Sequence, residues 1–228
     1  MDRIIEAYLK DFRDQFGLTL LKEAMVFERF INHCVISKHH PDHFDPDEVT
    51  AGGSGDLGMD GLGIIVNDHL VFDTEAVEYL KKQLRRLDVQ FVFIQSKMSA
   101  HFDGAEIGNF IAGVRCFFEH ELPPTVNNEL RQLHAIKEHI FDSSIHMDRN
   151  PTCRLYYATT GTWTDEVALR ALTNQGIRDL KQTNQSLRAP CGRAGSVERT
   201  RVTGWTRRGS GVGLWRFLPP RAAVEAVG

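Results

Sequence analysis

The segment VQFVFIQSK (89–97) ends in two side chains suited to phosphodiester chemistry. Its residues favour a β-strand, and side chains alternate between the faces of a strand. Gln95 and Lys97 therefore share one face with Phe91 and Phe93. The Gln95 oxygen could help hold Mg²⁺, and the Lys97 ammonium could stabilise developing negative charge or orient the attacking water. Gln-x-Lys alone is a weak indicator, because short polar strand ends are common.

A carboxylate lies at the end of a glycine-rich segment, GGSGDLGMDGLGIIV (52–66). Asp60 stands where this segment enters an expected strand, so its carboxylate would be fixed and still open to solvent. Mg²⁺ commonly takes one or two protein carboxylates, and Asp60 fits that role. A turn carrying two solvated acids is the competing interpretation. A nucleotide-cradling loop is less favoured, since GxxxxGK[ST] is absent. Asp56 is expected either to support a metal or to make an Asx-type turn.

A further acid is expected on a helix over residues 20–36, whose apolar face includes Phe27 and Ile31. Glu28 falls at the edge of that face. A carboxylate held against an apolar wall would be a metal-site or water-orienting group, or else a helix acid that reaches outward to solvent. Glu28 becomes a candidate only together with Asp60 and Lys97.

These motifs together resemble a known nuclease superfamily. FERF, GGSGDLGMDG and FIQSK resemble the Asp…(Glu/Gln)-x-Lys, or PD-(D/E)xK, nucleases and especially their Mrr-like restriction endonuclease branch. The order of VNDHLVF, FVFIQSK and FDGAEIGNF also resembles the abortive infection phage resistance (AIPR) family. The resemblance covers about residues 20–187. It implies an α/β, restriction-endonuclease-like core with a central mixed β-sheet flanked by helices. It also implies a Mg²⁺ cofactor, with Mn²⁺ as a substitute, and a DNA substrate cleaved in phage defence.

The resemblance also implies roles for four residues. Asp60 matches the metal-binding acid, Gln95 the second metal ligand, Lys97 the catalytic lysine and Glu28 the first-helix acid. Many relatives carry an acid where this chain has Gln95, and the expected helix over 75–87 is an insertion in the compact core. The alternative function is a catalytically inactive nucleic-acid-binding or defence-sensing module on the same fold, which Gln95 and the net negative charge of the main body favour. A third possible function, a nucleotide-binding signalling protein, is supported by the glycine-rich segment alone.

The other elements predict one α/β domain over residues 1–187, with its core over 20–160. Helices are expected over 2–16, 75–87, 126–141 and from Thr164 to about 182, and GIIV and HLVF should form a hairpin around Asn67-Asp68. Thr74 is the expected cap of the helix over 75–87. Asp103 and Glu106 resemble a capping box. SKHHPDHFDPDEV (37–49) is expected to be a solvated, mobile loop rather than a metal site.

Composition separates a main body from an unusual tail. The 228 residues carry a formal charge of −3, which divides into −9 before residue 188 and +6 from there on. The tail (188–228) is an Arg- and Gly-rich segment, interpreted as a basic phosphate-binding arm or as an out-of-frame or artificially added end. No apolar run approaches membrane-spanning length and no signal peptide is recognisable. The four widely spaced cysteines favour a reducing cytoplasm. A homodimer is left open.

Overall fold

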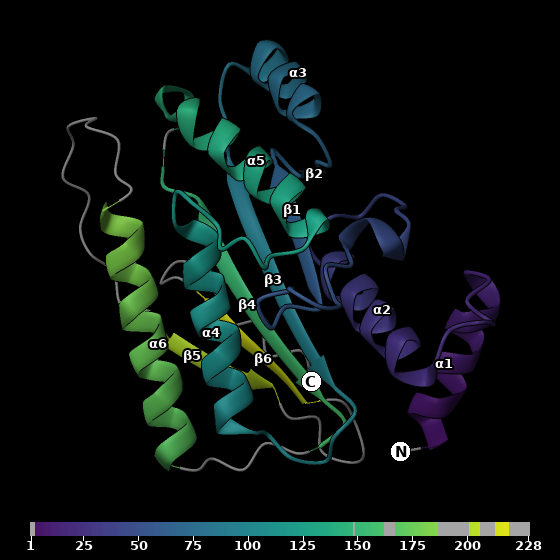
Figure 1. Ribbon diagram of the computed structural model, residues 1–228. Helices are drawn as coiled ribbons and strands as arrows, with labels where there is room; N and C mark the ends of the chain where they lie inside the picture. Colours follow the sequence, from purple (N-terminus) through teal and green to yellow (C-terminus); the bar gives the residue numbers. More distant parts are fainter. Residues whose placement is uncertain (1–2, 148, 162–166, 187–200, 206–212, 219–228) are drawn as a thin grey trace.

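The computed structural model describes residues 3–147, 149–161, 167–186, 201–205 and 213–218. They form a mixed α/β fold with one open sheet, in the strand order β2-β1-β3-β4-β6-β5, and helices on both of its faces (Figure 1). The helices are α1 (Arg3–Gln15), α2 (Glu23–Ile36), α3 (Thr74–Leu84), α4 (Gly104–Phe118), α5 (Asn128–Asp142) and α6 (Val167–Ser186). The strands are β1 (Gly61–Val66), β2 (His69–Leu70), β3 (Val89–Lys97), β4 (Thr152–Thr159), β5 (Arg201–Trp205) and β6 (Gly213–Leu218).

The central strand is β3, whose bounds match the sequence prediction. It runs antiparallel to β1, with Gly61 opposite Ile94, and parallel to β4, with Gln95 beside Tyr157. The predicted hairpin is confirmed: β1 and β2 are joined through Asn67 and Asp68, both at positive φ. The carboxyl ends of β3 and β4 and the start of β1 therefore meet at one edge of the sheet.

Side-chain alternation along β3 builds a separate apolar core on each face of the sheet. Phe91 and Phe93 pack with residues of α4 and α5, whereas Val92 and Ile94 pack with residues of α1 and α2. Figure 1 shows α4 and α6 side by side over the first face and α1 beside α2 on the other side. Burial of both faces explains why β3 is apolar at almost every position.

The caps at the starts of α3 and α4 differ from those predicted from the sequence. Asp73, not Thr74, caps α3 by accepting the Ala76 N–H. Asp103 caps α4 through the N–H groups of Ala105 and Glu106. The Glu106 carboxylate turns instead toward the sheet, so the predicted capping box is wrong.

Part of the 37–49 segment packs against the α2-side core. Asp45 and Glu48 form a capping box around the 3-10 turn Pro46–Val49, and Phe44 and Val49 are buried in the α2-side core. Most of the other residues of the segment are exposed, as predicted. Its mobility stays a prediction.

The tail is described only in part. Its strands β5 and β6 pair with each other, and β6 pairs antiparallel with β4. Cys191, the rest of the tail and the expected start of α6 at Thr164 lie outside the described residues. Whether the tail is a native end stays a prediction. No helix in the described ranges has the length and apolar character that a membrane crossing requires.

Candidate active site

Asp60 is anchored through its backbone, one residue before β1. Its N–H donates to the Ile94 carbonyl at 2.9 Å, and its carbonyl accepts from Asn32 Nδ2 on α2 at 2.9 Å. The close approach of α2 depends on Gly61, where an added Cβ would lie 2.3 Å from Asn32 Oδ1. The strand pairing and the helix thus fix Asp60 beside the last residues of β3.

The Asp60 carboxylate is bound by the residue between the two predicted site residues of β3. Its Oδ2 accepts the Ser96 N–H at 2.7 Å and the Ser96 hydroxyl at 2.9 Å. The residue is 6% exposed. Burial, aided by the Glu28 charge, raises the Asp60 pKa from 3.8 to about 7, although Ser96 and Lys97 act to lower it. A cation at this point would remove much of the cost of the buried charge.

Lys97 reaches the α4 side of the sheet. Its Nζ lies 3.7 Å from Glu106 Oε1, and the Tyr157 hydroxyl donates to Glu106 Oε2 at 3.0 Å. Tyr157 is fully buried, and burial together with Glu106 raises the pKa of its hydroxyl. The Lys97 side chain is 39% exposed. Glu106 thus links the Lys97 ammonium to the buried Tyr157, and Lys97 remains partly exposed to solvent.

Glu28 approaches from α2, on the opposite face. Its Oε2 lies close to Gly52, 3.5 Å from where a Cβ would stand. Partial burial raises the Glu28 pKa, and the Arg29 and Lys97 charges act against that rise. Because Glu28 and Lys97 both shift the Asp60 pKa, the three charges lie close enough to interact. The three side chains come from both faces of the sheet and lie where β3 ends and β1 begins.

Gln95 contributes an oxygen without a hydrogen-bond partner. The side chain is 3% exposed, and its Oε1 is buried and accepts no bond from the described residues. Leaving such an acceptor unpaired is costly. Both Ser96 bonds fall on Asp60 Oδ2, and Oδ1 accepts none from the described part of the chain. These two oxygens suit a hard cation such as Mg²⁺. Within the same ranges, no three His, Cys, Asp or Glu side chains gather as a metal site.

The glycine-rich loop before Asp60 is shaped by packing rather than by a nucleotide cradle. At Gly55, which has a φ of +80°, a Cβ would lie 2.3 Å from the Thr125 carbonyl oxygen. On α4, a Cβ at Gly113 would lie 1.8 Å from the Leu57 carbonyl oxygen. Asp56 makes the Asx-type turn, accepting the N–H groups of Gly53 and Gly58. The loop is thus held against α4 and the segment that follows it.

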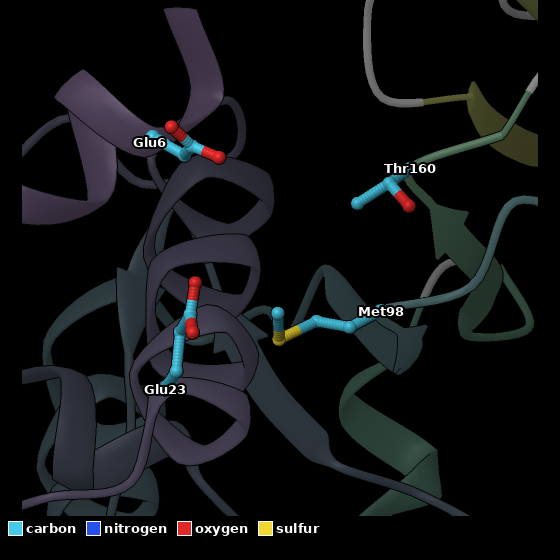
Figure 2. A pocket seen from close by; sticks show the side chains of 4 residues that line it. All are labelled: Glu6, Glu23, Met98 and Thr160. Carbon is cyan, nitrogen blue, oxygen red and sulfur yellow. The ribbon is translucent and has the colours of Figure 1, made fainter. Parts of the chain in front are cut away.

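A hollow of about 350 Å³ opens next to this site. Glu6, Glu23, Met98 and Thr160 line it, and Figure 2 shows the Met98 side chain pointing from the end of β3 toward α2. Met98 directly follows Lys97. The four predicted site residues are not among its described lining, and its two carboxylates make it unfavourable for a polyanion.

The sequence did not indicate three residues that support the candidate site: Asn32, Ser96 and Glu106. Ser96 alternates away from Gln95 and Lys97, so the strand pattern gives no reason to select it. Glu106 stands three residues after Asp103 and so fits a capping box equally well. For Asn32, the sequence offered one indication of a structural role, a polar side chain among the apolar residues of its helix.

Comparisons of the chain with family profiles, characterised proteins and solved structures find no match. The resemblance to PD-(D/E)xK nucleases and to the AIPR family therefore remains an interpretation of the motifs. Any functional conclusion rests on the geometry around Asp60.

Proposed function

We propose that this chain is a Mg²⁺-dependent endonuclease that hydrolyses phosphodiester bonds of DNA. The main support for this proposal is that Asp60 accepts two hydrogen bonds from Ser96, the residue between Gln95 and Lys97. A buried carboxylate, an unpaired amide oxygen and an accessible ammonium are thereby gathered at one sheet edge. These are the groups needed to hold a divalent cation and a phosphate side by side.

Each residue has a distinct part in this proposal. Asp60 Oδ1 and Gln95 Oε1 would hold Mg²⁺, which when bound polarises the phosphate and lowers the pKa of water. Lys97 would neutralise charge developing on the phosphate oxygens. Glu28, half-buried and with a raised pKa, is suited to accept a hydrogen bond from the attacking water. The restriction-endonuclease-like fold and the setting in phage defence belong to the same proposal.

A binding module without catalysis is the second candidate. Two observations favour it: an uncharged amide stands where many nucleases of this type have an acid, and the adjoining hollow carries Glu6 and Glu23. Such a module would bind nucleic acid or sense it without cleaving it.

Cleavage of supercoiled plasmid in the presence of Mg²⁺ separates the two candidates. Lys97→Ala should lower the cleavage rate on the order of 10²–10³-fold, because it removes charge stabilisation in the transition state. Lys82→Ala, at an exposed position on α3, is the matched control and should leave the rate unchanged. Wild-type protein that binds DNA or RNA yet cleaves neither with Mg²⁺ or Mn²⁺ would establish the binding module instead.

A further inference from the structure

A second hollow, of about 300 Å³, lies at the opposite end of β3. It is bordered by the segment after α2, the β1–β2 hairpin and the residues at the starts of β3 and β4. Gln90, Thr152 and Arg154 line it from strand positions on the α2 side of the sheet. Lys97 lies seven positions after Gln90 along β3, roughly 23 Å of extended strand. The hollow is therefore separate from the candidate active site.

The lining of this second hollow is polar and carries a small net positive charge. Lys38, Arg149 and Arg154 contribute three positive charges, and Asp68 and Asp88 contribute two negative ones. The hollow beside Lys97 has the reverse character, with two carboxylates and no cation in its described lining. A small anion would thus favour the end of β3 that is remote from the active site.

The two guanidinium groups are held in place by neighbours. Arg149 Nε donates to Asp88 Oδ1 at 3.0 Å, and Arg149 also contacts Asp88 Oδ2. Arg154 Nε donates to Gln90 Oε1. Asp88 is thereby largely offset by Arg149, and the other charged lining residues are Lys38, Arg154 and Asp68. Guanidinium groups that are already oriented lose less freedom when they bind an anion.

We propose that this hollow binds a small, polar phosphomonoester through its phosphoryl group. Arg and Lys donors together match a phosphate in geometry and charge, and a phosphomonoester carries about −1.5 to −2 at neutral pH. The volume is at the small end for ligand pockets. Ile65 is the sole apolar side chain among its described lining residues, so the hollow offers little to a base or another large apolar group.

Two variants with opposite expected effects test the site. The probes are inorganic phosphate and glycerol phosphate, titrated calorimetrically into the full chain. Lys38→Gln should weaken both affinities about tenfold, the loss of one charge-assisted hydrogen bond. Lys10→Gln, at an exposed position on α1, is the matched control. Asp68→Asn removes a lining negative charge and should tighten binding about threefold. Asp68 has a φ of +67°, which Asn tolerates well, so the fold is preserved.

Three results would overturn the site. The first is no saturable binding of either probe up to tens of millimolar. The second is Lys38→Gln and Asp68→Asn both matching Lys10→Gln. The third is displacement of bound phosphate by a DNA duplex without terminal phosphates, with the affinity for the duplex reduced in Lys38→Gln. That result would make this surface a contact for backbone phosphodiesters. Asp60→Asn should leave phosphate binding unchanged, so this proposal and the nuclease proposal can fail independently.

Discussion

Ser96 donates both its backbone N–H and its hydroxyl to a single oxygen of Asp60, at 2.7 and 2.9 Å. The two donors partly offset the burial that raises the Asp60 pKa. They also fix which carboxylate oxygen is engaged by the protein and which one can meet a cation. Ser96 is therefore a positioning residue for the proposed metal ligand.

Ser96→Ala should weaken Mg²⁺ binding severalfold at neutral pH. The substitution keeps the N–H bond and removes the hydroxyl bond, so protons compete more strongly with the cation for Asp60. Mn²⁺ and Mg²⁺ titrations by calorimetry measure the effect. Ser96→Thr restores the hydroxyl and should recover most of the affinity. Equal affinities in all three proteins would show that the hydroxyl does not act on the metal site.

Asp60→Asn should stabilise the metal-free protein above neutral pH. Because the folded-state pKa of Asp60 is raised from 3.8 to about 7, the wild type loses stability as pH rises through that interval. The loss amounts to roughly 4 kcal/mol at pH 8, and Asn avoids it while still accepting the Ser96 bonds. Urea denaturation at pH 4 and pH 8 should give similar stabilities at the lower pH and a more stable variant at the higher one. Parallel pH profiles would contradict the prediction.

Gln95→Glu should make the protein more dependent on divalent cations. A third carboxylate near Asp60 and Glu28 is repelled in the metal-free state and attracted to a bound cation. The rise in melting temperature on adding Mg²⁺ should therefore be larger in the variant than in the wild type. Gln132→Glu, at an exposed position on α5, provides the control. A Mg²⁺ response no larger than that of Gln132→Glu would remove Gln95 from the proposed ligand set.

Gly113→Ala should destabilise the protein by several kcal/mol. The added Cβ would stand 1.8 Å from the Leu57 carbonyl oxygen, a backbone atom that cannot rotate away. Gly108→Ala in the same helix meets only the Leu172 Cδ1 at 3.9 Å. That change should be neutral or stabilising by up to about 1 kcal/mol through helix propensity. Chemical denaturation of both variants provides the comparison, and two similar midpoints would refute the close contact.

The sequence predicted what depends on local patterns. The bounds of β3, the hairpin at Asn67-Asp68 and the opposite faces of Phe93 and Ile94 follow from alternation and turn residues. Asp60, Gln95, Lys97 and Glu28 were selected from their chemistry and from the resemblance of the motifs to PD-(D/E)xK nucleases. Their catalytic roles stay predictions.

The contacts that support these residues depend on pairings distant in the sequence. Ser96 meets Asp60 because β1 and β3 pair antiparallel in one register, and a residue's own strand pattern does not contain that register. Glu106 was assigned to a cap because its spacing from Asp103 fits one. The direction of its side chain depends on Tyr157, which lies 51 residues further on.

The contact between the Leu57 carbonyl and Gly113 has an evolutionary consequence. The glycine-rich loop and α4 are separated in sequence, yet a side chain at position 113 is excluded by the path of the loop backbone. Substitutions that shift the loop, and with it Asp60, would be selected jointly with changes in α4. Among homologues, a residue larger than glycine at position 113 should appear only together with insertions, deletions or altered glycines between positions 52 and 60.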